Sequence, residues 1–368
     1  MHFNDRGVKT LPMAKNYASV VSMNDVKLKP AAAKRRKSAQ PTMDDIARLA
    51  AASKTTVSRA LSGSPLVSEE KREQILRIAR EHGYAVNRNA QKLRQTRTNT
   101  VAVVLDFESH RHGAIGDPFI YELLAGVSEA LSVRDVDLLL SPPGLSNLSD
   151  FVDLHRSRGA DGYIILGQGM REPMFCDLAR KKIPMVVWGA VMPESGYCAV
   201  GSDNFLGGQL AGERFVKQQR KHWLFVGNTA HDEIRLRYEG LKHVANASAD
   251  VKVDLLQIDT MAFSETLKNA EEYLQGGDRP DAIFAFSDTA SMAIISAFRQ
   301  YGLAAPNDYA LVGYNNIPPA AHFSPAITTI GQDTSTAGTL LVERLMQQLD
   351  GARPKSVILP TKLIVRET

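Results

Sequence analysis

From Thr100 onward, short apolar runs of β type alternate with amphipathic helical stretches such as 119–131 and 204–218. The apolar runs are VAVVL (101–105), VDLLL (136–140), YIIL (163–166), PMVVW (184–188), WLFV (223–226), AIFAF (282–286) and YALVGY (309–314). This alternation predicts an α/β fold, because helical crossovers join parallel strands and cover both faces of the sheet. About 270 residues are too many for one such sheet. We therefore expect two lobes with parallel sheets and a ligand cleft at the strands' carboxyl ends.

Residues 42–83 have a different pattern, with three short helical stretches in succession. Thr42, Ser53 and Ser68 are of N-cap type and stand where these stretches begin. Gly63 and Gly83 follow the second and third stretches as stop signals. The segment TMDDIARLAAASKTTVSRAL (42–61) thus predicts a helix, a tight turn and a second helix, the order of a helix-turn-helix.

Charge is distributed unevenly along the chain. The first 97 residues hold 20 Lys and Arg against 8 Asp and Glu, whereas the remaining residues hold 24 against 32. A basic head on an acidic body indicates a polyanion-binding head, although a solvated charged tail would give the same balance. The basic cluster KRRK (34–37) and its Ala, Ser and Pro neighbours predict a disordered basic arm over 1–40.

The helix-turn-helix prediction favours a DNA-binding head over a solvated charged tail. The second helix of this motif enters the DNA major groove with its first residues at the base edges. Lys54, Thr55 and Thr56 occupy that place and supply an amine, hydroxyls and methyl groups for base contacts. We expect Ser53, Ser58 and Arg59 to lie nearer the phosphates.

On these residues the chain resembles the lac repressor and galactose repressor family of bacterial transcriptional regulators. The matching string runs without a gap from Thr42 to Leu93. It contains Asp45-Ile46-Ala47, Ser53, Thr56-Val57-Ser58-Arg59, Val67-Ser68, Arg72, Ile75, Gly83-Tyr84, Asn87 and Ala90…Leu93. One departure is Ala51-Ala52, where the family usually has Gly-Val. Ala51 is therefore expected to adopt a turn conformation that glycine adopts more easily, at a cost of about 1 kcal/mol.

The resemblance implies that NRNAQKLR (87–94) is a hinge helix that orders on operator DNA. Leu93 from each of two subunits would wedge open a base step in the minor groove, flanked by Asn87, Ala90 and Gln91. The alternative is an ordinary polar linker with one leucine. Thr42 and Tyr84 complete the predicted DNA-binding residues. The expected domains are the arm 1–40, a helix-turn-helix domain 41–86, a hinge and linker 87–97, and an effector-binding and dimerisation body 98–368.

The body resembles the two-lobed periplasmic-binding-protein fold of the same family. The strings that carry this resemblance are Asp117-Pro118-Phe119, Gly159-Ala160-Asp161-Gly162, Val200-Gly201-Ser202-Asp203-Asn204, Arg237-x-x-Gly240, Pro280-Asp281-Ala282-Ile283, Asp288, Gly302 with Pro306, Val312-Gly313-Tyr314-Asn315-Asn316, and Thr328-Thr329-Ile330-x-Gln332. By resemblance Arg237 faces the effector, although a surface salt bridge is the alternative role. Asn315, Ser287 and Gln332 are further polar contacts, and Phe119 and Ile120 belong to the first-lobe wall.

Two aromatic residues of the expected cleft have open roles. Phe263 is either a stacking platform for the ligand or plain core, and Trp188 either stacks on an oligosaccharide or is core. Gly189 stands where lac-repressor-like proteins carry an Asp, so this chain lacks that sugar-binding carboxylate. The family's ligands are mostly sugars, with purines and nucleosides in some branches. The sequence favours a carbohydrate.

Other classes are less consistent with the sequence. No G-x-S-x-G, Walker, H-E-x-x-H or paired-cysteine zinc motif is present, so we expect neither an enzyme, a cofactor nor a metal. Cys176 and Cys198 are predicted to be reduced. No apolar run or leader of membrane or secretory type is found, which favours the cytoplasm and no membrane partner.

A periplasmic-type sugar-binding protein and a non-specific DNA-packing protein remain alternatives to a homodimeric, effector-gated repressor on a pseudo-palindromic operator. We expect a dimer and not a tetramer, because the last residues do not form a leucine heptad of the tetramerising kind.

Overall fold

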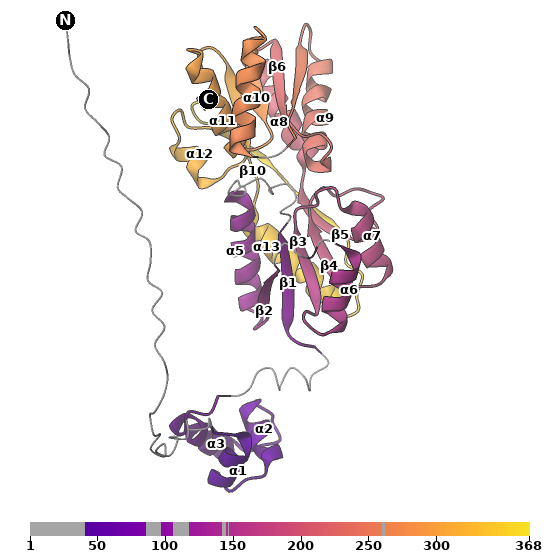
Figure 1. Ribbon diagram of the computed structural model, residues 1–368, viewed down its shortest axis with the longest axis vertical. Coiled ribbons are helices and arrows are strands. Elements are labelled where there is room, and N and C mark those ends of the chain that lie inside the picture. The colour runs from indigo at the N-terminus through magenta and orange to yellow at the C-terminus, as the bar shows by residue number, and fades with distance from the viewer. Residues whose placement is uncertain (1–40, 86–96, 106–117, 142–144, 146, 260–261) are drawn as a thin grey trace, which may run out of the picture. The chain divides into compact units, whose positions relative to one another are not determined.

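The computed structural model describes residues 41–85, 97–105, 118–141, 145, 147–259 and 262–368. The chain forms two compact units that divide after Asn87 (Figure 1). The predicted basic arm (1–40) and all but Arg97 of the predicted hinge and linker (87–97) lie outside the described residues.

The head unit contains three helices around a small apolar core that includes Ile46, Val57 and Ile75. The helices are α1 (Met43–Leu49), α2 (Lys54–Leu61) and α3 (Glu69–Glu81). Thr42 forms a capping box with Asp45, and the Ser53 hydroxyl accepts a hydrogen bond from the Thr56 amide at 3.0 Å, which confirms two predicted caps. Ser68 lies at the N-cap position of α3, but its hydroxyl makes no capping hydrogen bond.

The first lobe of the body is a parallel sheet in the order β11-β5-β4-β3-β1-β2. Its strands are β1 (Thr100–Leu105), β2 (Asp137–Ser141), β3 (Gly162–Leu166), β4 (Met185–Trp188), β5 (Cys198–Ser202) and β11 (Val357–Leu359). Its helices are α5 (Pro118–Ser132), α6 (Leu148–Arg156), α7 (Glu172–Arg180) and α13 (Thr334–Leu349). Figure 1 shows α13, in yellow, among the purple elements of this lobe, although it follows the second lobe in sequence.

The second lobe has a sheet in the order β12-β10-β9-β8-β6-β7, with β12 antiparallel to β10. Its strands are β6 (His222–Gly227), β7 (Lys252–Gln257), β8 (Ala282–Ala285), β9 (Ala310–Asn315), β10 (Thr328–Gly331) and β12 (Lys362–Ile364). Its helices are α8 (Asn204–Lys217), α9 (Asp232–Asn246), α10 (Phe263–Gln275), α11 (Asp288–Gln300) and α12 (Pro318–His322). Two lobes of α/β type with parallel sheets are therefore confirmed.

All seven apolar runs named from the sequence overlap strands. Five further strands, β5, β7, β10, β11 and β12, were not predicted from hydrophobic runs. The edge strand β7, for example, is only partly buried and mixes Lys252 and Asp254 with apolar residues. Its backbone pairing to β6 is a tertiary contact that a local apolar pattern does not report.

The chain passes between the lobes three times, after β5, after β10 and between β11 and β12. The first and third crossovers are tied together, because the Asp203 amide donates to the Leu359 carbonyl at 2.9 Å and the Thr361 hydroxyl donates to the Asp203 carbonyl at 3.2 Å. These crossovers make the body a pair of linked lobes with a shared cleft.

The described residues include both cysteines of the chain. Cys176 and Cys198 are free thiols, and burial raises the pKa of the Cys198 thiol to about 11. Within the described part of the chain, no helix has the length and apolar character needed to cross a membrane.

Candidate functional site

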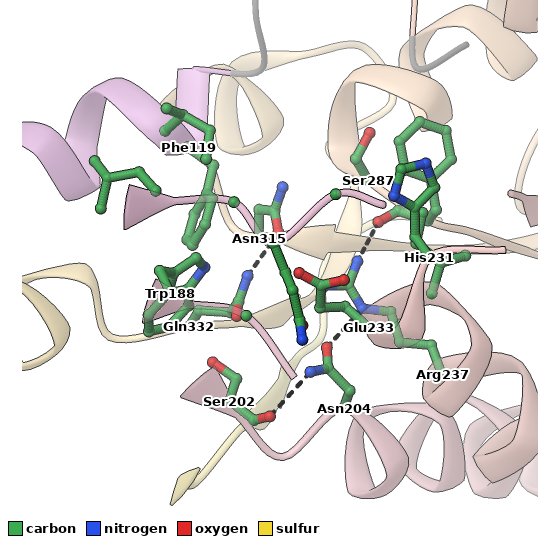
Figure 2. A pocket seen from close by; sticks show the side chains of 18 residues that line it. Phe119, Trp188, Ser202, Asn204, His231, Glu233, Arg237, Ser287, Asn315 and Gln332 are labelled. Carbon is green, nitrogen blue, oxygen red and sulfur yellow. Dashed lines mark hydrogen bonds between the residues drawn. The ribbon is translucent and has the colours of Figure 1, made fainter. Parts of the chain in front are cut away.

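A pocket between the two lobes of the body lies at the carboxyl ends of the strands (Figure 2). It holds about 760 Å³ of empty space, part of which is open to solvent. The described residues that line it are Phe119, Ile120, Leu166, Gly167, Gln168, Gly169, Trp188, Gly189, Ser202, Asn204, His231, Glu233, Ile234, Arg237, Phe286, Ser287, Asn315 and Gln332. The cleft predicted from strand polarity is thus present, because parallel strands direct all their carboxyl ends to one edge.

The first-lobe wall of the pocket is aromatic and uncharged over its described lining residues. Phe119 of α5 and Trp188 of β4 pack with ring centroids 5.8 Å apart and planes tilted by 47°. Ile120 adds a third apolar side chain. Trp188 is only 6% exposed, so it serves the core and the pocket wall together. An apolar wall with two aromatic rings suits the face of a sugar ring or a base.

Gln168 explains why position 189 is glycine. A Cβ on Gly189 would lie 2.7 Å from both the Cβ and the Oε1 of Gln168. The Gln168 amide is itself held in place, since its Nε2 donates to the Tyr197 hydroxyl at 2.6 Å and its Oε1 accepts from the Ala190 amide at 2.9 Å. A buried amide therefore occupies the space next to the position where the resembling family carries a carboxylate.

The second-lobe wall is polar and is organised around Arg237 of α9. Its Nε donates to Asn204 Oδ1 at 2.9 Å, and its Nη1 donates to the Phe286 carbonyl at 2.7 Å. The guanidinium carbon lies 3.5 Å from the centroid of the Tyr314 ring. Burial raises the pKa of Tyr314 to about 12, although the nearby guanidinium acts in the opposite direction. Arg237 is thus a fixed cation at the pocket wall and not a surface residue.

Glycines bring α8 and α9 close enough to build this network. A Cβ on Gly240 would lie 2.0 Å from the Phe205 carbonyl oxygen, and a Cβ on Gly208 would lie 2.0 Å from the Arg237 carbonyl oxygen. Both contacts are to backbone atoms, which cannot move without separating the helices. The spacing Arg237-x-x-Gly240 therefore places the guanidinium beside Asn204 because the glycine lets the two helices touch.

Other polar groups of the wall come from the strand ends and the crossovers. Gln332, in the second crossover, donates to Asn315 Oδ1 at 2.7 Å. Asn315 has φ 103°, a backbone conformation that asparagine tolerates better than most side chains. Ser202, at the first crossover, is 5% exposed, and its Oγ has no hydrogen-bond partner among the described residues. Ser287 caps α11 by accepting from the Ala290 amide at 3.1 Å.

The structure brings together seven of the eight residues predicted for effector binding. Phe119, Ile120, Trp188, Arg237, Ser287, Asn315 and Gln332 line the pocket. Phe263 is not among the lining residues; it begins α10 and is 39% exposed, so it is neither core nor part of this wall. Sequence reasoning missed the polar lining residues Gln168, Ser202, Asn204, His231 and Glu233. Glu233 stands four residues before Arg237, and this helical spacing is a signal that could have identified it.

The head unit presents the predicted DNA-contacting residues on and around α2. Lys54, Thr55 and Arg59 are exposed, and Lys54 Nζ lies 2.9 Å from a carboxylate oxygen of Asp44 on α1. The hydroxyls of Ser53 and Thr56 bond to each other at 2.8 Å, and Ser53 is also the N-cap of α2. Ser58 is half-buried, and Tyr84 packs against the head core. Asn87, Ala90, Gln91 and Leu93 lie outside the described residues.

Within the described residues no cluster of three or more His, Cys, Asp or Glu side chains is arranged to hold a metal ion. The lining of the pocket offers hydrogen-bonding groups on one wall and an aromatic surface on the other.

Two family descriptions match parts of the chain. Residues 42–87 match "Bacterial regulatory proteins, lacI family", and residues 213–368 match "Periplasmic binding protein-like domain". Among similar proteins are the ribose operon repressor of Haemophilus influenzae and the transcriptional repressor PurR of Photobacterium profundum. The first is 28% identical over 89% of this chain and 98% of its own length. The second is 29% identical over 84% and 92%.

Two solved structures extend the likeness to the fold. A complex of the transcriptional regulator CelR with cellobiose has a TM-score of 0.64 and 28% identity, and covers 89% of this chain and 99% of the other. The lac repressor dimer bound to operator and the anti-inducer ONPF has a TM-score of 0.78 and 21% identity, and covers 90% and 99%. The helix-turn-helix head, the two-lobed body and these similarities lead to one conclusion. The chain belongs to the lacI family of bacterial regulatory proteins, and it is a DNA-binding transcriptional regulator with an effector-binding body.

Proposed function

We propose that this protein is a homodimeric cytoplasmic repressor, not an enzyme, whose affinity for operator DNA is gated by a carbohydrate bound in the pocket. The observation that carries the proposal is the fixed Arg237 facing an aromatic wall across the cleft. Ring faces of a sugar suit the wall of Phe119 and Trp188, whereas its hydroxyls suit the amides and the guanidinium opposite. The similarity to a ribose operon repressor and to a cellobiose-bound regulator supports this ligand class.

A purine is the second candidate effector. The tilted pair Phe119 and Trp188 would also stack on a base, and several relatives are named PurR. Six described lining residues carry an amide or a hydroxyl group, and this number favours a ligand with many hydroxyls: Gln168, Ser202, Asn204, Ser287, Asn315 and Gln332. Nucleobases therefore belong in the test as the competing class.

The pocket lies beside the crossovers that join the two lobes, and this position indicates how a bound ligand could change the affinity for operator DNA. Ser202 is the last residue before the first crossover and Gln332 follows β10 in the second, and both line the pocket. A ligand held by both lobes changes their relative position only if it binds the two states with different affinity. We propose that this change is passed to the segment 87–97, which joins the body to the head.

DNA recognition is assigned to the head and the hinge. We propose base contacts for Lys54, Thr55 and Thr56 and phosphate contacts for Ser53, Ser58 and Arg59, with Thr42 and Tyr84 holding the head in register. Leu93 is the proposed minor-groove wedge, flanked by Asn87, Ala90 and Gln91. The fold similarity to a lac repressor dimer on its operator supports two copies on a pseudo-palindrome.

The test is a fluorescence-anisotropy titration of the full chain against the DNA upstream of its own gene, at fixed salt, with scrambled DNA as control. The titration is repeated with a panel of sugars and nucleobases. We expect specific binding that one sugar shifts. Arg237→Ala should abolish that shift and keep operator affinity, and Leu93→Ala should weaken operator binding more than scrambled-DNA binding. Binding that ignores both sequence and ligand would refute the proposal and favour a packing role.

A further inference from the structure

We propose that Glu233 sets the charge of the pocket, so that the pocket selects an uncharged ligand over the carboxylate analogue of the same ligand. This inference rests on the proposed function, because it refines the class of effector. It is carried by the distribution of charge over the pocket walls.

The permanent charges of the described lining both lie on one helix. Glu233 and Arg237 are four residues apart on α9, on the same face of the helix. Figure 2 shows the Glu233 carboxylate in the middle of the pocket, beside the Arg237 side chain. The first-lobe wall contributes no charged side chain among its described residues. Glu233 is therefore the one permanent negative charge among the described lining residues, and Arg237 is the one permanent positive charge.

Arg237 is also poorly prepared to clamp a carboxylate. A guanidinium binds a carboxylate best through two parallel N–H groups. Here the Nε is already bonded to Asn204 and the Nη1 to the Phe286 carbonyl, while Tyr314 covers one face of the group. The pair of donors formed by Nε and Nη2 is therefore partly occupied by the protein itself.

Single hydrogen bonds to ligand hydroxyls remain compatible with this geometry. Ser202 Oγ, buried and without a partner among the described residues, is a donor and acceptor for one hydroxyl. An anionic ligand would bring a second negative charge into a small pocket that already holds the Glu233 carboxylate. Like charges a few ångström apart in a partly buried site lower affinity by about tenfold or more.

The first arm of the experiment needs no effector. The chain has two tryptophans, of which Trp223 is fully buried and Trp188 lines the pocket. Quenching of Trp188 fluorescence by iodide and by acrylamide, at pH 8 and constant ionic strength, compares the access of an anion with that of a neutral molecule.

We expect Glu233→Gln to raise the ratio of the iodide to the acrylamide quenching constant by about twofold or more. Glu233→Asp keeps the charge and should keep the wild-type ratio, which separates charge from packing. Glu239→Gln is the matched control on the same helix, because Glu239 is exposed and pairs with Arg235 at 2.8 Å. An unchanged ratio in Glu233→Gln, or an equal change in Glu239→Gln, overturns the inference.

The second arm uses matched pairs of an aldose and its uronic acid, glucose with glucuronate and galactose with galacturonate, measured by the thermal shift of the full chain. We expect the wild type to prefer the neutral member, and Glu233→Gln to reduce that preference about tenfold. Equal binding of both members by the wild type overturns the inference. If no sugar binds while the quenching ratio changes as expected, the charge assignment stands and the carbohydrate proposal fails.

Discussion

At the scale of single residues, Ala51 shows how a turn is made without the residue best suited to it. It joins α1 to the segment before α2 with φ 44°, the left-handed conformation expected for the place where the resembling family has glycine. The side chain is exposed, so no packing offsets the strain. An alanine in this conformation is less stable than glycine by about 1 kcal/mol.

Ala51→Gly should therefore stabilise the head by up to about 1 kcal/mol, because glycine removes the strain of the left-handed turn. Hydrogen–deuterium exchange of the α1 and α2 amides in the full chain measures this, and slower exchange is expected. The adjacent Ala52→Gly is the control: Ala52 has no left-handed backbone and is partly buried against the head core, so exchange should be faster. Faster exchange in Ala51→Gly would contradict the strain argument.

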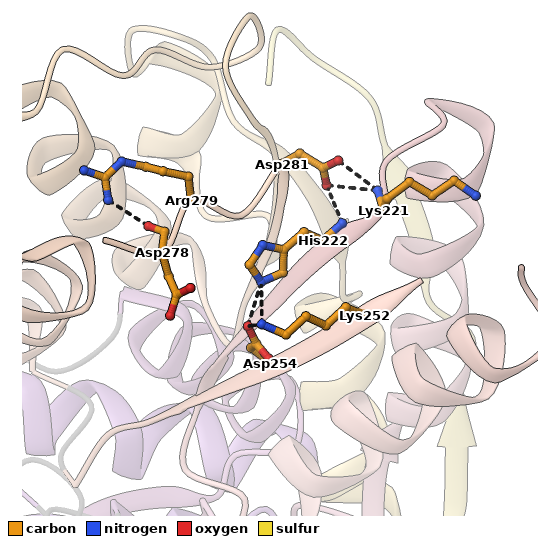
Figure 3. A network of polar contacts seen from close by, with 7 residues as sticks. All are labelled: Lys221, His222, Lys252, Asp254, Asp278, Arg279 and Asp281. Atoms are coloured by element: carbon orange, nitrogen blue, oxygen red, sulfur yellow. Dashed lines mark hydrogen bonds and ion pairs between the residues drawn. The ribbon is translucent and has the colours of Figure 1, made fainter. Parts of the chain in front are cut away.

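A second local cluster joins the first residues of β6 and β7 (Figure 3). His222 Nε2 lies 2.6 Å and Lys252 Nζ 2.7 Å from Asp254 Oδ2. Partial burial acts to raise the pKa of Asp254, but the hydrogen bonds from Lys252 and His222 outweigh it and hold the pKa below its ordinary value. The carboxylate therefore binds protons less readily in the folded chain than in the unfolded chain.

This shift predicts how stability changes with pH. The contribution of Asp254 is present above the unfolded pKa, about 3.9, and is lost as the pH falls through the lower folded pKa. Asp254→Asn should lower stability by up to about 1 kcal/mol at pH 7 and by less near pH 3. Thermal unfolding at both pH values measures the difference, with the exposed Asp153→Asn as control. A loss of equal size at both pH values would refute the linkage.

At the scale of elements, the contact between α8 and α9 decides the geometry of the pocket. The backbones meet at Gly208 and Gly240, where no side chain fits. The contact turns Arg237 toward Asn204, which begins α8 directly after the first crossover. One helix pair thus links the cation of the pocket to the chain segment that connects the lobes.

Gly240→Ala should destabilise the body by about 1–3 kcal/mol, because the new Cβ would lie 2.0 Å from the Phe205 carbonyl oxygen and force the helices apart. The sign of the change in unfolding free energy tests the close contact, because Gly→Ala inside an exposed helix stabilises a protein by about 1 kcal/mol. Denaturant unfolding followed by Trp223 fluorescence measures it. Glu239→Ala, one residue earlier and exposed, should change stability by less than about 0.5 kcal/mol. A stabilised Gly240→Ala variant would disprove the close helix contact.

At the scale of the whole molecule, the functions are divided between the two compact units. Every described residue that lines the pocket belongs to the unit that starts at Arg88. The candidate base-contacting residues on α2 belong to the other unit. The candidate effector-binding residues and the candidate DNA-contacting residues of the described chain therefore belong to separate units.

Removal of residues 1–97 should leave the effector affinity of the remaining body within about twofold of the full chain, because no lining residue is lost. Operator binding should disappear. The effector found in the anisotropy screen, titrated by Trp188 fluorescence against both chains, measures the first part. Circular dichroism of the shortened chain checks that it is folded. A folded body with a tenfold weaker affinity would show that the head contributes to the pocket.

Much of the architecture could be read from local patterns. Alternating apolar and amphipathic stretches predict the α/β lobes, and cap residues such as Thr42 and Ser53 predict where the head helices begin. These signals are local because helix and strand periods and caps involve residues a few positions apart. The strands without such a pattern, such as the edge strand β7, were missed because backbone pairing to a distant neighbour defines them.

The pocket depends on long-range contacts that no local pattern contains. The Arg237 network joins Asn204, which is 33 residues away along the chain, and Asn204 in turn meets Tyr314 across 110 residues. Gln168 fills the space at Gly189, and Gln332 reaches Asn315, only after the sheets and crossovers have formed. By itself the sequence determined the fold class and the helix-turn-helix, and its resemblance to the family supplied Arg237 and Asn315 as candidates. Only the tertiary structure decided which other side chains share the cleft, because strand ends and close-packed glycines bring distant residues to one place.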